Sequence, residues 1–349
     1  MGRVIAKLTP ILALIVVWVV LVGPAAAVPE TGAISNEAVT RWMSGYRHKP
    51  EPGRMPLAAR ALSQAGAFKD TENSGAPVGF IAGVLGANPA RAEELVGKLL
   101  ALPVSDQWVI VRAIAYSGLP DWKGLLRKFA DRMPARTVMI DKYLSGELPT
   151  LDAIPLEKHK PTLWEKMKTP FSDKKPNPHA ATFEQSPEFL DTLWGIYFAT
   201  GNEAVITRMF PMLAWANEHD NVDKLTIGSM AKYTLVSNAV RDPDLLAMLK
   251  RARPGQPKEV SLALKEIIEA ADTMDTTRVR REALGAIEDL KRKGPQSKRD
   301  FATWGQIGQG ALAIGCIAAA ALGQVQFGLP CVLGGAASGA ALSYWNGQQ

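Results

Sequence analysis

The sequence predicts an all-α fold, in which an irregular, α-solenoid-like array of helices is divided into two halves and followed by a helical hairpin. The alternation of Val, Ile and Thr that marks strands is nearly absent, while Ala, Leu, Met, Glu, Lys and Arg, which favour helices, dominate the middle of the chain. Helix start and stop signals also recur, which is typical of stacked antiparallel helices. No clean repeat period is present, so we expect an irregular array.

The composition limits the size of the fold and the kind of partner. The chain has 349 residues, of which 47% are hydrophobic, enough for one large or two medium domains with a core. Its formal net charge of +6 is a mild basic excess, too weak to predict nucleic-acid binding. We therefore expect no nucleic-acid partner.

The N-terminus has the three parts of a secretory signal peptide. Arg3 and Lys7 precede an unbroken apolar run over residues 11–22, and small residues follow as far as Ala27. The run is short for a membrane-spanning helix, which needs roughly 20 residues. We expect residues 1–27 to be cleaved and the protein to be exported to the periplasm. The alternative is an uncleaved anchor with its N-terminus in the cytoplasm, which the two cations would also favour.

The N-terminal helical array is predicted over residues 28–145. Proline is expected in first turns, as at Pro56, and glycine at helix ends, as at Gly118. Asn88 and Ser105 are predicted to cap the helices that follow them. These signals predict helices over residues 36–46, 56–65, 77–85, 90–102, 106–117, 121–132 and 135–144.

An extended linker is predicted over residues 146–185, because this stretch contains six prolines. The C-terminal helical array follows over residues 186–294, where Asn202 starts a helix that bends near Pro211 and Asp242 caps another. The helices of this half are predicted over residues 189–200, 202–215, 222–240, 244–251, 257–271 and 276–293.

Two segments of the second half are FLDTLWGIYFATG, at residues 189–201, and GSMAKYTLVSNA, at residues 228–239. They resemble segments of an uncharacterised group of exported bacterial all-helical proteins, and the similarity covers residues 77–250. The resemblance implies a helical fold and an exported location. No activity is known for that group, so the resemblance implies no site residue.

Residues 295–349 are predicted to form a helical hairpin that packs on itself at or in a membrane. Its two apolar segments, 307–322 and 329–344, carry small residues at every fourth position, which lets two backbones approach closely in lipid. Both segments are shorter than the roughly 20 residues of a spanning helix, so the alternative is a pair of closing helices in a soluble bundle. The small residues are Ala311, Gly315, Ala319 and Gly323, then Gly335, Gly339 and Ser343.

The two cysteines, Cys316 and Cys331, lie on either side of the hairpin turn. In an oxidising compartment they could form a disulfide. The alternative is that both are small buried residues in the packing stripe, since free cysteine is often buried.

A basic stretch precedes the hairpin. Each cation contributes roughly 1 kcal/mol beside an anionic membrane, so this position predicts contact with a lipid surface. The alternative is a solvated helix face with i,i+4 ion pairs. The basic residues are Arg278, Arg280, Arg281, Lys291, Arg292, Lys293, Lys298 and Arg299.

The sequence carries few signals of catalysis. It contains no Gly-x-Ser-x-Gly elbow, phosphate-binding loop or Cys-x-x-Cys pair, and its four histidines lack metal-ligand spacing. We therefore expect no cofactor and no metal. Acidic side chains could still form a glycosidase site, which needs only two converging carboxylates. The alternative is that they are ordinary acids at helix N-termini, where the helix dipole favours them. The candidate acids are Glu188, Asp191, Glu203 and Glu218.

Together these features predict a non-enzymatic exported helical scaffold or interaction protein, associated with the membrane through its C-terminal hairpin. Its expected partners are the membrane lipid surface and an unidentified envelope protein. The alternative is a periplasmic enzyme that acts on the cell wall or on glycans with paired carboxylates. Two acids in a deep pocket would favour the enzyme, and an exposed apolar groove would favour the scaffold.

Overall fold

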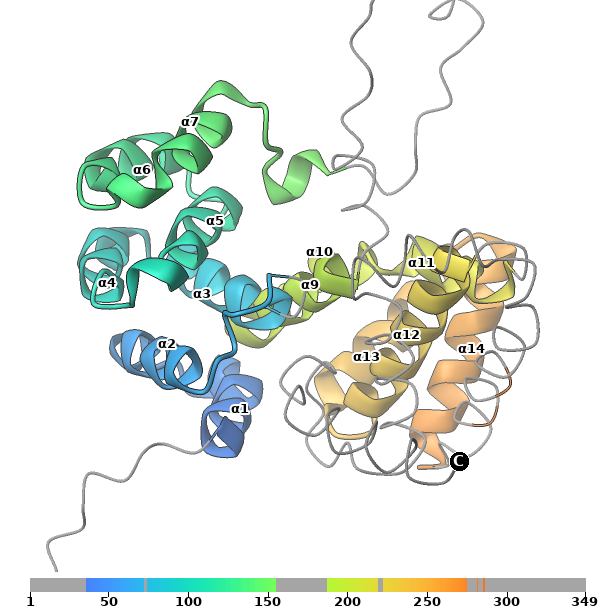
Figure 1. Ribbon diagram of the computed structural model, residues 1–349. Helices are drawn as coiled ribbons and strands as arrows, with labels where there is room; N and C mark the ends of the chain where they lie inside the picture. The colour runs from blue at the N-terminus through green and yellow to red at the C-terminus, as the bar shows by residue number, and fades with distance from the viewer. Residues whose placement is uncertain are drawn as a thin grey trace, which may run out of the picture. The chain divides into compact units, whose positions relative to one another are not determined.

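The computed structural model describes residues 36–71, 74–154, 187–218 and 222–274, together with residues 281 and 285. All regular secondary structure in these ranges is helical, and no strand occurs in them (Figure 1). The prediction of an all-α fold is therefore confirmed. The solenoid-like arrangement and the hairpin stay predictions.

Along the sequence, the described helices form two groups, one before residues 155–186 and one after them. The helices of the first half are α1 (Asn36–Gly45), α2 (Met55–Gln64), α3 (Gly75–Ala87), α4 (Ala92–Leu99), α5 (Trp108–Tyr116), α6 (Trp122–Ala130) and α7 (Thr137–Ser145). Those of the second half are α9 (Pro187–Thr200), α10 (Glu203–Thr207), α11 (Phe210–Ala214), α12 (Val222–Ala239), α13 (Pro243–Ala252) and α14 (Lys258–Asp272). Short 3-10 turns extend or join several of them, among them η1 (Tyr46–His48) and η6 (Leu151–Ala153).

Several helix boundaries follow the local signals of the sequence. As predicted, Asp242 caps α13, because its Oδ1 accepts the backbone N–H of Leu245 at 3.1 Å. Asn202 starts α10 in the same way, accepting the N–H of Ala204 at 2.9 Å. Gly201 ends α9 with a φ of +67°, a left-handed conformation that glycine adopts at little steric cost.

Two predicted caps are wrong. The side-chain amide of Asn88 donates to the carbonyl of Val84 at 2.8 Å, so it closes α3 instead of opening α4. The hydroxyl of Ser105 donates to Asp106 Oδ1 at 2.8 Å, and α5 begins only at Trp108. In both places a 3-10 turn precedes the α-helix, and this turn moves the predicted cap away from the helix start.

The single bent helix predicted over residues 202–215 is also wrong, because two short helices take its place. Residues 208 and 209 form a turn, and Pro211 lies in the first turn of α11, where a proline removes no helical hydrogen bond. The break redirects the chain. Helix α10 packs against α9, whereas α11 packs against α12 and α14.

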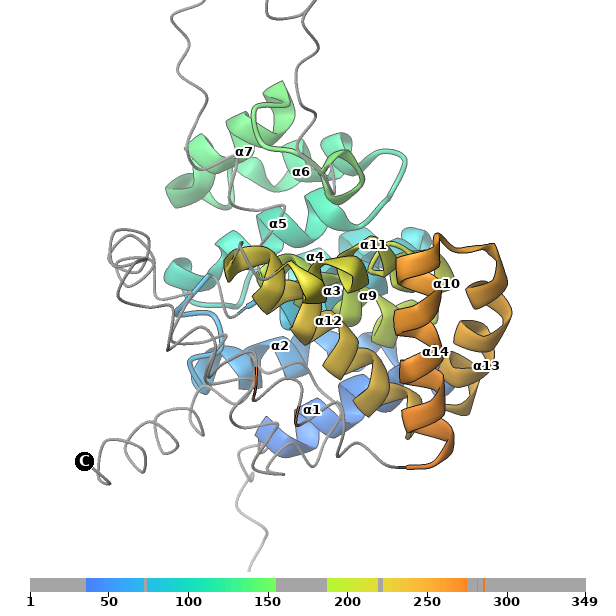
Figure 2. The ribbon, with the colours of Figure 1, turned by 90° about the vertical axis from the view of Figure 1, so that its right-hand side faces the viewer.

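Helices α3 and α9 form the centre of the fold (Figures 1 and 2). Every residue of α3 from Gly75 to Leu85 is buried, and so is every residue of α9 from Glu188 to Ala199. A helix that is buried on all sides belongs to a core and not to a surface. Around this pair, α2 and α5 pack against α3, while α1, α10 and α12 pack against α9.

The two central helices meet backbone to backbone. A Cβ on Gly79 would lie 2.1 Å from the carbonyl oxygen of Thr192, and a Cβ on Gly195 would lie 2.2 Å from that of Ala76. Only glycine permits such an approach. We call this contact the α3–α9 seam; sequence analysis expected small-residue packing only in the hairpin and missed it. The seam glycines are Gly75, Gly79 and Gly83 of α3 and Gly195 of α9.

The seam joins the two halves of the chain, so one hydrophobic core extends from Val39 to Ala271. The two halves also meet at Arg208, whose Nη2 donates to the carbonyl of Ile154 at 2.5 Å. The same guanidinium lies 5.1 Å from the ring centroid of Phe189. Ile154 and Phe189, which lie on either side of residues 155–186 in the sequence, therefore both contact Arg208.

Several predictions concern residues outside the described part of the chain. These are the signal peptide, linker residues 155–185, the hairpin with its small residues, the pair Cys316 and Cys331, and the basic stretch except Arg281, which is helical and exposed. Among the helices that the structure does describe, none is both long and apolar enough to cross a membrane.

Candidate functional site: a buried acid cluster

Two of the four candidate acids, Glu188 and Asp191, lie in the interior at the start of α9. They are three positions apart and therefore about one turn apart on the helix. Pro187 opens the helix, and an acid in the first turn is favoured by the helix dipole. Because α9 is a core helix, this ordinary N-terminal pattern places two carboxyl groups where water is excluded.

The charge of Glu188 is balanced by Arg112 of α5. Arg112 Nη1 donates to Glu188 Oε1, and the guanidinium also lies 4.9 Å from the ring centroid of Trp108. Burial acts to lower the pKa of Arg112, but the charge of Glu188 and the neighbouring tyrosines outweigh it, so the pKa is raised. Arg112 is therefore positively charged at neutral pH and forms an interior ion pair with Glu188.

Two tyrosines complete the surroundings of this ion pair. Tyr116 of α5 and Tyr143 of α7 meet edge to face, with ring centroids 6.3 Å apart. Burial is the main cause that raises the pKa of each hydroxyl. Both tyrosines therefore stay neutral, and their hydroxyls are polar groups that face an interior ion pair.

Asp191 differs from Glu188 because no cation balances it. Its exposure is 0%, and neither of its carboxyl oxygens has a hydrogen-bond partner among the residues that the structure describes. Burial first, and then the negative charge of Glu188, raise the pKa of Asp191 well above the usual range of an aspartate. Burial therefore favours the protonated form of Asp191, one turn from the carboxyl group that is paired with Arg112.

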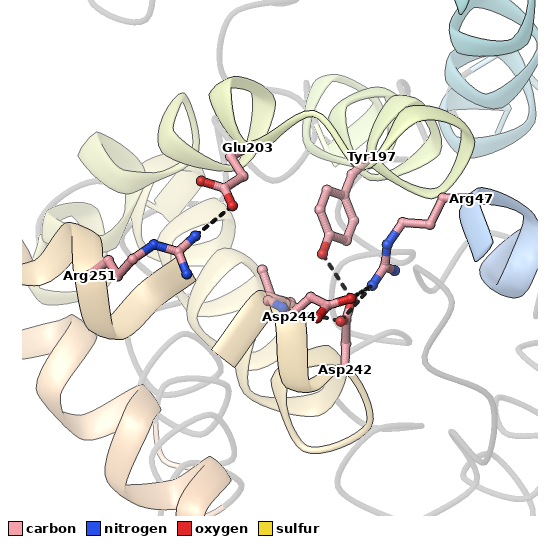
Figure 3. A network of polar contacts seen from close by, with 7 residues as sticks. Arg47, Tyr197, Glu203, Asp242, Asp244 and Arg251 are labelled. Atoms are coloured by element: carbon pink, nitrogen blue, oxygen red, sulfur yellow. Dashed lines mark hydrogen bonds and ion pairs between the residues drawn. The ribbon is translucent and has the colours of Figure 1, made fainter. Parts of the chain in front are cut away.

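The other two candidate acids lie elsewhere. Glu203 of α10 is exposed and forms an ion pair with Arg251 at 2.7 Å (Figure 3). Glu218 is exposed too, and its carboxylate lies 3.8 Å from the ammonium of Lys224. Neither acts on the pKa of Asp191. Of the four acids proposed as a catalytic set, the structure thus brings together Glu188 and Asp191.

A second polar network was not predicted from the sequence. Arg47 of η1 donates to Asp242 Oδ1 at 2.6 Å, and the hydroxyl of Tyr197 donates to Asp242 Oδ2 at 2.9 Å (Figure 3). The guanidinium of Arg47 lies 4.9 Å from the Tyr197 ring centroid. Its side chain and that of Asp242 are 10% and 12% exposed. The network links η1, α9 and α13, and only the capping role of Asp242 was visible locally.

Metal ligands do not gather in the described ranges: no group there has three or more His, Cys, Asp or Glu side chains placed to hold an ion. His48 is exposed in η1, whereas the other three histidines lie outside these ranges. Five aromatic residues of the second half are core residues and do not line an open surface. They are Trp194, Tyr197, Phe198, Phe210 and Trp215.

Comparison of the chain with protein-family models, with curated proteins and with solved structures found no match.

Proposed function

We propose that this chain is a non-enzymatic exported helical scaffold or interaction protein, associated with the membrane through its C-terminal hairpin. The scaffold part of the proposal rests on one observation: buried charges of the chain form ion pairs between separate helical elements. Glu188 is held by Arg112 of another helix, and Asp242 is held by Arg47, which lies 195 positions away. Both pairs connect elements that are distant in sequence, as expected of a rigid helical body.

The position of Asp191 supports the same conclusion. A catalytic acid must reach a substrate, and binding sites are concave and accessible. Asp191 instead lies against the α3–α9 seam, where a Cβ on Gly75 would be 2.9 Å from the Asp191 Cβ. This position suits a structural residue better than a group that donates a proton to a bound glycan.

The membrane part of the proposal rests on the sequence. The apolar run of residues 11–22, the basic stretch that begins at Arg278 and the small-residue stripes of residues 307–344 support export followed by attachment to an anionic lipid surface. The proposed partners are this lipid surface and an envelope protein that binds the helical body.

Cell fractionation tests the proposal. We expect the full chain to sediment with membranes, and a chain that lacks residues 304–349 to be folded, exported and released into the soluble fraction. Cross-linking in intact cells, followed by purification from solubilised envelope, should give the same protein partner with both chains. Aggregation or unfolding of the shortened chain would instead show that the hairpin belongs to the core.

One observation favours a second candidate, a periplasmic enzyme of the cell wall or of glycans: Asp191, whose pKa is raised well above the usual range of an aspartate, lies one turn from Glu188, which is paired with Arg112. Paired acids with different protonation states are typical of acid–base catalysis. The test is hydrolysis of purified cell wall and of soluble glycans by the full chain. Activity that disappears in both Glu188→Gln and Asp191→Asn, while both variants stay folded, would establish the enzyme.

A further inference from the structure

The α3–α9 seam contains a carboxyl group whose ionised form no cation or hydrogen-bond donor of the described residues stabilises. Asp191 donates to and accepts from no other group in the described part of the chain, and it is fully buried. The adjoining helix is α3, whose sequence GAPVGFIAGVLGA contains no titratable residue. Because the backbones of the two helices touch at the glycines, no long polar side chain from α3 can fold over the carboxyl.

The charged and titratable side chains on the surrounding elements are engaged elsewhere or exposed. Burial and Glu188 are the causes that act on Asp191, and Arg112 is already paired with Glu188. Tyr116 of α5 and Tyr143 of α7 lie beside Arg112. On η1, Arg47 is paired with Asp242, Tyr46 packs edge to face against Trp42 and Phe80, and His48 is exposed. Tyr197 of α9 donates to Asp242, Glu203 of α10 is paired with Arg251, Lys224 and Lys232 of α12 are paired with Glu218 and Glu266, Tyr233 of α12 is partly buried, and Arg41 of α1 is exposed.

We propose that Asp191 is a proton-operated latch of the α3–α9 seam: the seam closes around the neutral carboxyl group, and loss of its proton at alkaline pH opens the seam. The physical reason is that a buried carboxylate without a hydrogen bond or a counter-ion is strongly unfavourable. Opening the seam hydrates the carboxylate and lets water screen the charge of Glu188, which lies one turn away on the same helix. The latch is independent of what the helical body binds.

The sign of the pH dependence follows from linkage. Below the ordinary aspartate pKa of 3.8 the carboxyl is protonated in both the folded and the unfolded chain, and its contribution to stability is fully present. Above that pH the unfolded chain releases the proton while the folded chain keeps it. Stability is therefore lost as pH rises towards the raised pKa of folded Asp191, and the unfolding equilibrium constant grows about tenfold for each pH unit.

The first test compares urea unfolding of the full chain with that of Asp191→Asn between pH 5 and 9. The asparagine cannot ionise, so the ratio of the two unfolding constants should change about tenfold per pH unit over the linked range. Asp141→Asn is the matched control, because Asp141 is an exposed aspartate of α7. Its curve should run parallel to that of the wild type. A parallel curve for Asp191→Asn would overturn the proposal.

The second test measures the opening itself and does not require the variant to fold. Hydrogen exchange in the wild type, corrected for intrinsic rates, should accelerate at alkaline pH in α3 and α9 before it does so in α13 and α14. Carbon-13 spectra of labelled aspartates should show one carboxyl that is still protonated at pH 7. If every aspartate titrates near its ordinary pKa, or if all helices open together, the latch does not exist.

Discussion

Replacement of Gly79 by alanine tests the central feature of the fold, the α3–α9 seam. The added methyl group would lie 2.1 Å from the carbonyl oxygen of Thr192, whereas ordinary contact requires at least 3.4 Å. The two helices must therefore separate by about 1.3 Å at this point, since the obstacle is backbone and cannot rotate away. Separation would also loosen the contacts that Gly195 makes with Ala76.

The expected magnitude is the difference between two opposing effects. Alanine is a better helix former than glycine by about 0.5–1 kcal/mol. Overpacking of a close-packed core costs typically about 1–3 kcal/mol, and a clash with backbone belongs at the upper end. We therefore expect Gly79→Ala to lower the free energy of unfolding by about 2 kcal/mol, and the Tm by roughly 4–8 °C for a domain of this size.

Urea unfolding followed by circular dichroism measures this effect, and Gly97→Ala in α4 is the matched control. A Cβ on Gly97 meets no atom within 4 Å, so only the helix propensity changes there. The same substitution should stabilise the chain by about 0.5–1 kcal/mol at Gly97 and destabilise it at Gly79. If Gly79→Ala is as stable as the wild type, the backbones do not meet as described.

Three other predictions concern the rest of the chain. Asp242→Ala should lower the free energy of unfolding by about 2–4 kcal/mol, because it removes a helix cap and takes from the buried guanidinium of Arg47 its close partner. The control is Asp244→Ala, at a side chain 77% exposed, which should change stability by less than about 0.5 kcal/mol in the same urea assay. Equal losses in the two variants would contradict this prediction. Replacement of residues 155–186 by a Gly/Ser linker of about ten residues should leave the melting transition unchanged or raise stability by about 1 kcal/mol, because the flanking residues Ile154 and Phe189 both contact Arg208 and a short linker can join them. A large loss would mean that the segment packs on the core. In the hairpin, Gly335→Leu should abolish sedimentation with membranes while the core melts as before. Gly334→Leu, one position off the small-residue stripe, should still sediment with membranes. Unfolding of the core by Gly335→Leu would contradict the membrane proposal.

Local signals in the sequence predicted most helices of this fold because helix boundaries depend on neighbouring residues. Asp242 and Gly201 act through backbone groups within a few positions, and these groups are visible in the sequence. The caps expected at Asn88 and Ser105 failed for the opposite reason. Each of these side chains has a second possible partner nearby: a carbonyl of the preceding helix for Asn88 and an adjacent carboxylate for Ser105. Only the folded geometry decides whether the side chain binds this partner or caps the next helix.

The tertiary features could be predicted only in part. Glu188 and Asp191 were among the candidate acids, but nothing near them in sequence indicates that Arg112 pairs with the first and not with the second. Arg47 and Asp242 are likewise 195 positions apart. Gly75, Gly79 and Gly83 of α3 recur at every fourth position, a pattern that favours close packing but does not identify the partner. Helix α9 can be the partner because its own glycine, Gly195, faces the same seam.

The pairing of α3 with α9 also has a consequence for how the chain is made. Helix α3 ends at Ala87 and its partner begins at Pro187, about 100 residues later. At roughly 5–20 residues per second, α3 therefore exists for on the order of 5–20 s before the segment that covers it has been synthesised. During that interval an entirely apolar helix is available to chaperones, or to a second nascent chain. The second half of the sequence thus completes the interior of the first, and a ribosome that stops before residue 187 releases a product in which α3 packs at most against α2, α4 and α5 and lacks its main partner, α9.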